Sequence, residues 1–128
     1  MTHRMRLRVY YEDTDLAGIV YYANYFKFIE RARSEWVREI GIDQVAMKAE
    51  GIVFAVRRVE ADYFMPANYD DELVVRTVTE KATGARLVLR QTVLRDDAPL
   101  FEALVTIVAI GANGAAARLP ANIRRANS

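Results

Sequence analysis

The chain has no cysteine and only one histidine among its 128 residues. Without cysteine it can form no disulfide, no thiolate metal site and no thiol nucleophile. A long apolar run is missing too, so the sequence predicts no secretory signal and no membrane span, and we expect a cytoplasmic protein. An excess of one charge is also absent, because 18 Lys and Arg balance 17 Asp and Glu. A net charge of +1 gives no global attraction to nucleic acid or to an anionic membrane.

The composition is that of an ordinary globular protein, with 52% hydrophobic and 27% charged residues. A chain of this length fits one domain, residues 1–128, and can bury a real core. It leaves limited room for a deep active site within one chain, so a partner subunit could supply a missing wall.

The first half of the chain predicts a strand followed by a long helix. Residues 4–11 alternate between apolar and polar side chains, the period of a half-buried strand that ends near Tyr11. From Asn24 onward apolar residues recur at helical spacing as far as Ile40. Gly41 is expected to end this helix, and Asp43 to cap a short second one that Gly51 closes.

The second half predicts strands. Four runs are rich in β-branched and aromatic residues: Ile52–Phe64, Leu73–Glu80, Ala85–Leu94 and Leu100–Ile110. Short links with turn residues separate them, which favours antiparallel neighbours. From about residue 112 the periodicity is lost, and we expect a loosely held tail. The order predicts an α+β protein with an antiparallel sheet packed on one dominant helix, whose unpaired edge strands favour pairing with a second copy.

Three carboxylates, Glu12, Asp13 and Asp15, lie between the first strand and the long helix, just before a turn at Gly18. One of these acids could face the N-terminus of the helix, which has unpaired N–H groups and the positive end of the helix dipole. Taken alone, Asp15 is more often a turn or capping acid than a catalytic one. No second acid-rich or histidine segment has ligand spacing, so we expect no metal site.

The string EDTDLAGIVYYANYFKFIERARSEW resembles the signature of the hotdog-fold acyl-CoA thioesterases of the 4-hydroxybenzoyl-CoA thioesterase family. In that signature an Asp-x-Asp pair, here Asp13-Thr14-Asp15, precedes Gly18-Ile19-Val20-Tyr21. The later string GIVFAVRRVEADYFMPANYDDEL is similar to the family branch associated with the Tol-Pal envelope system. Tyr22 stands where many members of that branch carry histidine, so the chain mixes features of two branches and leaves the acyl preference open.

The resemblance implies a hotdog fold in which a five-stranded antiparallel sheet wraps around one long central helix. It also implies hydrolysis of an acyl-CoA to a free acid and CoA, without a metal or other cofactor. Asp15 would be the nucleophile or general base, and the backbone N–H near Tyr22 would polarise the thioester carbonyl. Gly18 would let the thioester approach the backbone. The family further implies a homodimer with active sites at its interface, commonly within a homotetramer, and leaves open an acyl carrier protein as the substrate donor.

By the same resemblance the pantetheine arm and the acyl group pass beside Phe54, Ala55 and Val56, which could equally be sheet core. Two other functions are weighed against the thioesterase. A hotdog hydratase or dehydratase commonly pairs a histidine with an acid, but the one histidine, His3, lies in an N-terminus expected to be mobile. A non-catalytic acyl-CoA or acyl-carrier-protein binding module would keep the pocket without needing Asp15, and turnover separates it from the enzyme.

Overall fold

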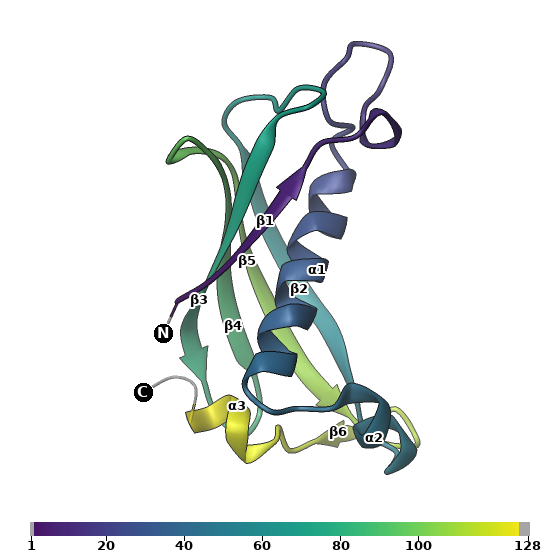
Figure 1. Cartoon of the computed structure of the whole chain (residues 1–128). Helices are drawn as coiled ribbons and strands as arrows, with labels where there is room; N and C mark the ends of the chain where they lie inside the picture. The colour runs from purple at the N-terminus through teal and green to yellow at the C-terminus, as the bar shows by residue number, and fades with distance from the viewer. Residues whose placement is uncertain (1, 126–128) are drawn as a thin grey trace.

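The computed structural model describes residues 2–125. The elements, shown in Figure 1, are β1 (Thr2–Arg8), the 3₁₀ turn η1 (Tyr11–Asp13), α1 (Asn24–Glu39), α2 (Gln44–Ala49), β2 (Val53–Tyr63), β3 (Glu72–Ala82), β4 (Leu87–Arg95), β5 (Ala98–Ile110), β6 (Ala116–Ala117) and α3 (Ala121–Arg125). The predicted order of strands and helices is confirmed, and β6 and α3 add to it.

The sheet is antiparallel, in the order β1-β3-β4-β5-β2, with β6 paired to β5. α1 lies along one face of this sheet (Figure 1). The α+β class and the antiparallel sheet around one long helix are therefore confirmed. The sheet has six strands rather than the expected five because Ala116 and Ala117 pair with the end of β5.

α1 forms because its apolar residues share one stripe, which meets the sheet. The stripe is buried in the core and consists of Tyr25, Phe28, Ile29, Ala32, Trp36 and Val37. After α1, Asp43 caps α2 as predicted, since its Oδ1 accepts hydrogen bonds from the N–H groups of Val45 and Ala46 at 3.0 and 3.1 Å. The helices thus begin and end close to the positions that the sequence predicts.

The N-terminal strand differs from the prediction at both ends. It ends at Arg8, because the chain turns into η1, and Tyr11 is 83% exposed rather than inward-facing. His3, expected in a mobile N-terminus, instead lies in β1 and is buried. Its Nε2 atom is 2.9 Å from Oε2 of Glu39 in the last turn of α1. His3 is therefore part of the folded structure, at the end of β1 opposite to Asp15.

The expectation of a loosely held tail is wrong for the described part of the C-terminal segment. Leu119 and Ile123 are buried, and the N–H of Leu119 donates to the carbonyl oxygen of Gly84 at 2.9 Å. Nδ2 of Asn122 donates to the carbonyl oxygen of Ile40 at 3.0 Å. The segment is held because two apolar side chains four residues apart reach the core despite polar neighbours.

β2 is an edge strand that pairs only with β5 within residues 2–125. Three of its valines, Val53, Val56 and Val59, are exposed by 38–48%. A long edge with unpaired backbone groups and apolar side chains favours pairing with another chain. Within the described part of the chain, no helix has the length and apolar character needed to cross a membrane.

Candidate active site

The segment between η1 and α1 folds into a tight loop. Isolated antiparallel bridges join Thr14 to Val20 and Ile19 to Asn68. The N–H of Asp15 donates to the carbonyl oxygen of Ile19 at 2.9 Å, and the N–H of Gly18 donates to the carbonyl oxygen of Asp15 at 3.0 Å. We call this segment, residues 13–24, the catalytic loop, after the role that the family resemblance predicts for Asp15. Its backbone bonds hold Asp15 in a defined turn.

The carboxylate of Asp15 is exposed at the surface of this turn. Its Oδ1 accepts one hydrogen bond, from the N–H of Ala17 at 2.9 Å. Within residues 2–125 its second oxygen has no hydrogen-bond partner, and no lysine or arginine nitrogen lies within 4.0 Å. The side chain is thus oriented by the backbone while one oxygen remains available to a substrate or a water molecule.

Asp13 stabilises the start of the loop through its carboxylate and its carbonyl oxygen. Its Oδ2 accepts from the N–H of Tyr10 at 2.9 Å, and its carbonyl oxygen accepts from the N–H of Tyr21 and from Nδ2 of Asn24, both at 2.9 Å. Glu12 is exposed in η1. Asp13 therefore closes the base of the catalytic loop and leaves Asp15 at its tip.

Tyr22 lies just before the N-terminus of α1, and its side chain is 62% exposed. In the described part of the chain its N–H has no acceptor, and Ala23 offers no side-chain cap to the first turn of the helix. Free N–H groups at a helix N-terminus attract an oxygen that carries negative charge. Asp15 and this N–H belong to one loop, so a carboxylate and a potential oxyanion donor occur together.

Tyr63, at the end of β2, positions the backbone of Tyr22. Its Oη donates a hydrogen bond to the carbonyl oxygen of Tyr22 at 2.8 Å. The Tyr63 ring meets those of Tyr22, Tyr25 and Phe101 at centroid distances of 6.4, 5.6 and 5.0 Å. Burial, and then the neighbouring phenols of Tyr22 and Tyr25, raise the pKa of Tyr63. Its hydroxyl therefore remains a donor at neutral pH.

Replacing Tyr63 with phenylalanine removes this hydrogen bond but keeps the ring. We expect kcat for thioester hydrolysis to fall about fivefold, because a net hydrogen bond contributes roughly 1 kcal/mol, while KM changes little. The measurement is steady-state CoA release, with Tyr69→Phe as the control because Tyr69 is exposed and forms no hydrogen bond within residues 2–125. Equal kcat values for the two variants would contradict a positioning role of Tyr63.

Gly18 has φ +81°, and a Cβ added there would meet no atom within 4 Å. Alanine therefore fits sterically but is strained in the left-handed region, at a cost of about 1–2 kcal/mol. We expect Gly18→Ala to lower the free energy of unfolding by that amount and also to reduce kcat/KM, because the turn holds Asp15. Gly114, with φ +73° and equally open surroundings, is the matched control. Gly114→Ala should lose similar stability and keep its activity; equal activity of the two variants would refute a site role for Gly18.

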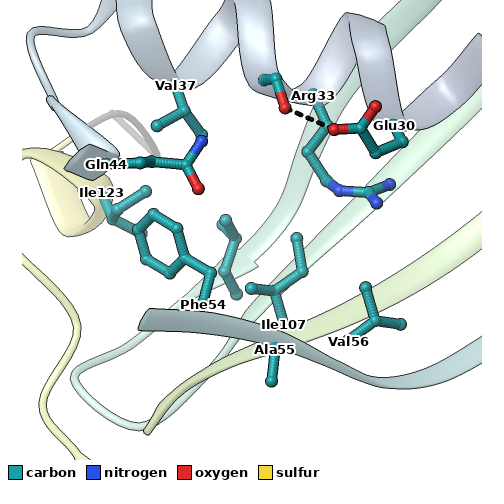
Figure 2. A pocket seen from close by; sticks show the side chains of 11 residues that line it. Glu30, Arg33, Val37, Gln44, Phe54, Ala55, Val56, Ile107 and Ile123 are labelled. Carbon is teal, nitrogen blue, oxygen red and sulfur yellow. Dashed lines mark hydrogen bonds between the residues drawn. The ribbon is translucent and has the colours of Figure 1, made fainter. Parts of the chain in front are cut away.

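The structure does not bring Phe54, Ala55 and Val56 together with Asp15 in one chain. They lie at the start of β2, whereas the catalytic loop meets Tyr63 at its end, roughly 23–30 Å away along an extended strand. The three residues line a cavity between α1 and β2 (Figure 2). The predicted site residues therefore form two groups at opposite ends of the molecule.

The sequence did not point to Tyr63, to Arg33, which reaches into this cavity, or to buried Gln91 as site residues. The alternation of β2 marks Tyr63 only as a strand residue, and no local pattern reveals its bond to Tyr22. Among residues 2–125, no cluster of three histidine or acidic side chains could hold a metal ion.

The profile of the thioesterase-like superfamily matches residues 9–126. The acyl-CoA thioester hydrolase YbgC of Escherichia coli O6:H1 is 41% identical over 108 residues, which is 84% of this chain and 81% of that protein. The acyl-CoA thioesterase YbgC of Haemophilus influenzae is 36% identical over 105 residues, 81% of this chain and 77% of that protein. The crystal structure of a probable thioesterase from Bartonella henselae superposes with a TM-score of 0.89 at 35% identity, covering 94% of this chain and all of that one. The resemblance found in the sequence is thus confirmed: the chain belongs to the thioesterase-like superfamily and is a thioesterase of the hotdog fold.

Proposed function

We propose that this thioesterase hydrolyses acyl-CoA to a free carboxylic acid and CoA, with Asp15 as the reacting carboxylate. The observation that carries the proposal is that the loop holding Asp15 also contains the N–H of Tyr22, which has no acceptor in the described part of the chain. The YbgC proteins of E. coli and H. influenzae, named for acyl-CoA thioester hydrolysis, support the substrate class.

The chemistry needs two groups on one thioester. The Asp15 carboxylate either attacks the carbonyl carbon, which gives an anhydride that water then hydrolyses, or removes a proton from a water molecule that attacks instead. In both cases the carbonyl oxygen gains negative charge, and the N–H of Tyr22 stabilises it. The CoA thiolate leaves and takes up a proton. Exposure of Asp15 leaves room for both routes.

The active site is completed by a second copy of the chain. If two β2 edges pair antiparallel around their midpoints, the start of one strand lies beside the end of the other. This pairing brings Phe54, Ala55 and Val56 of one protomer next to Tyr63 and the catalytic loop of its partner. The exposed valines of β2 and the separation of the two residue groups support such an interface.

Several finer properties remain predictions of the family resemblance. They are assembly of two dimers into a homotetramer, an acyl carrier protein as an alternative acyl donor, a cytoplasmic location and an association with the Tol-Pal envelope system. Each concerns contacts with other molecules or a cellular location rather than the catalytic loop itself.

The direct test is CoA release by the purified protein from short, long and aromatic acyl-CoAs. Turnover of any of them supports the proposal, and the rates give the acyl preference. Binding without turnover across the panel, and with acyl carrier protein thioesters as well, would instead favour an acyl-binding module.

A further inference from the structure

The cavity between α1 and the start of β2 has an apolar end and a polar end. Its volume is about 180 Å³. Phe54, Ile107 and Ile123 supply apolar walls, while Glu30 and Arg33 extend from α1 at the other end, as Figure 2 shows. This volume lies below the roughly 300–1,000 Å³ of pockets for drug-sized ligands, so the cavity suits part of a ligand.

Arg33 is half-buried and is held by a buried amide. One of its guanidinium nitrogens donates to Oε1 of Gln91 at 2.9 Å. Gln91 is fully buried, and its Nε2 in turn donates to the carbonyl oxygen of Ile29 at 2.9 Å and to Oγ1 of Thr77 at 3.0 Å. The guanidinium therefore has a defined place, and one bond to Gln91 leaves several of its N–H donors free.

The charge of Arg33 lacks a close counterion. No carboxylate oxygen lies within 4.0 Å of its guanidinium in the part of the chain that the structure describes. The nearby carboxylate of Glu30 accepts a hydrogen bond from Oγ of Ser34 at 2.8 Å instead. Burial lowers the pKa of Arg33, and the charge of Glu30 offsets this only in part. A half-buried cation without a paired anion is costly, and an anionic group in the cavity would remove that cost.

We propose that Arg33 binds a carboxylate at the far end of the acyl chain, so that the preferred substrates are CoA thioesters of dicarboxylic acids. This inference rests on the proposed function, because the acyl chain enters the cavity only if the partner's catalytic loop faces Phe54, Ala55 and Val56. The apolar walls of the cavity would contact the methylene groups, and the guanidinium would meet the terminal carboxylate.

A carboxylate fits Arg33 better than a neutral group does. The planar guanidinium presents parallel N–H donors that match the two oxygens of a carboxylate, and such charge-assisted bonds are about twice as strong as neutral ones. A CoA phosphate is the other available anion, but every acyl-CoA carries it. Pairs of substrates that differ only at the acyl terminus therefore separate the two possibilities.

The experiment measures kcat/KM for three pairs of equal chain length: succinyl- and butyryl-CoA, adipoyl- and hexanoyl-CoA, and suberoyl- and octanoyl-CoA. We expect the wild type to prefer the carboxylate-bearing member of the best pair by about 10- to 100-fold. Arg33→Gln should reduce this ratio to near one, and Arg33→Lys should retain part of it. The matched control is Arg31→Gln, because Arg31 is exposed on the same helix and lies outside the cavity; it should keep the wild-type ratio.

Three outcomes would overturn the inference. The first is a wild-type kcat/KM ratio near one for all pairs, and the second is an unchanged ratio in Arg33→Gln. The third is a preference for ω-hydroxyhexanoyl-CoA over hexanoyl-CoA as large as the preference for adipoyl-CoA over hexanoyl-CoA. The ratio of two kcat/KM values measured on one variant does not change when part of that variant is unfolded, because both values fall by the same factor. Thermal unfolding confirms that each variant folds.

Calorimetry of the same substrate pairs binding to the Asp15→Asn variant distinguishes a failure of the proposed hydrolysis from a failure of the carboxylate site. A preference for the dicarboxylic member in binding, without turnover by the wild type, would refute the hydrolysis and keep the carboxylate site. Equal binding of the members of each pair would refute the carboxylate site whatever the turnover.

Discussion

Asparagine in place of Asp15 is expected to lower kcat for acyl-CoA hydrolysis by about 10²- to 10⁴-fold, the contribution of a positioned acid or base. The amide is nearly isosteric, and its oxygen can still accept the hydrogen bond from the N–H of Ala17. It can neither attack the thioester effectively nor take a proton from water. The turn should therefore persist, and the dissociation constant for acyl-CoA should change little while turnover is lost.

The matched control for this change is Asp97→Asn in the exposed turn between β4 and β5. Asp97 has φ +66°, a conformation that asparagine tolerates well. This variant makes the same chemical change outside the catalytic loop and should retain wild-type rates. CoA release under saturating substrate measures both variants, and calorimetry measures binding. Full activity of the Asp15 variant would exclude its carboxylate from the mechanism.

The second large effect is expected at the β2 edge. Aspartate in place of the exposed Val59 would put a charge on each of two apolar edges that are proposed to meet. We expect Val59→Asp to shift the protein from dimer to monomer and to lower kcat/KM at least about 100-fold, because each site would lose the wall supplied by its partner. Light scattering coupled to size exclusion, together with CoA release, measures the two consequences in one preparation.

Val45→Asp is the control for that substitution, because Val45 is 81% exposed on α2 rather than on β2. It should remain dimeric and active. A Val59 variant that is monomeric but fully active would refute the shared site, whereas one that stays dimeric and active would place the interface elsewhere.

Local patterns predicted most of the fold. The helical stripe of α1 and the cap at Asp43 depend on neighbours within a few residues, so the sequence locates them to within about two residues. The strands follow from β-branched runs between turn residues. The errors came where a few side chains decide the outcome through distant contacts: His3 packs against α1, and Leu119 and Ile123 hold a segment of otherwise small and polar residues.

The site could be predicted only in part. The resemblance pointed to one short segment with Asp15, Gly18 and Tyr22, and the structure places these three in one loop. It also pointed to the start of β2, which lines a separate cavity within one chain. The bond from Tyr63 to Tyr22 joins residues 41 positions apart. The hydrogen bond from Arg33 to Gln91 joins residues 58 positions apart. Such contacts depend on strand register and on the way the helix crosses the sheet, and neither is encoded in a local pattern.

If the cavity holds the acyl group as proposed, the segment that ends in α3 gives the protein a way to change its substrate range without changing its chemistry. Ile123 forms part of the cavity wall, yet the segment contributes no reacting group and lies at the far end of α1 from the catalytic loop (Figure 1). Substitutions there can reshape the space for the acyl group while Asp15 and Tyr22 stay as they are. Evolution or a protein engineer could therefore retune this enzyme from its C-terminal side, through substitutions at and around Ile123.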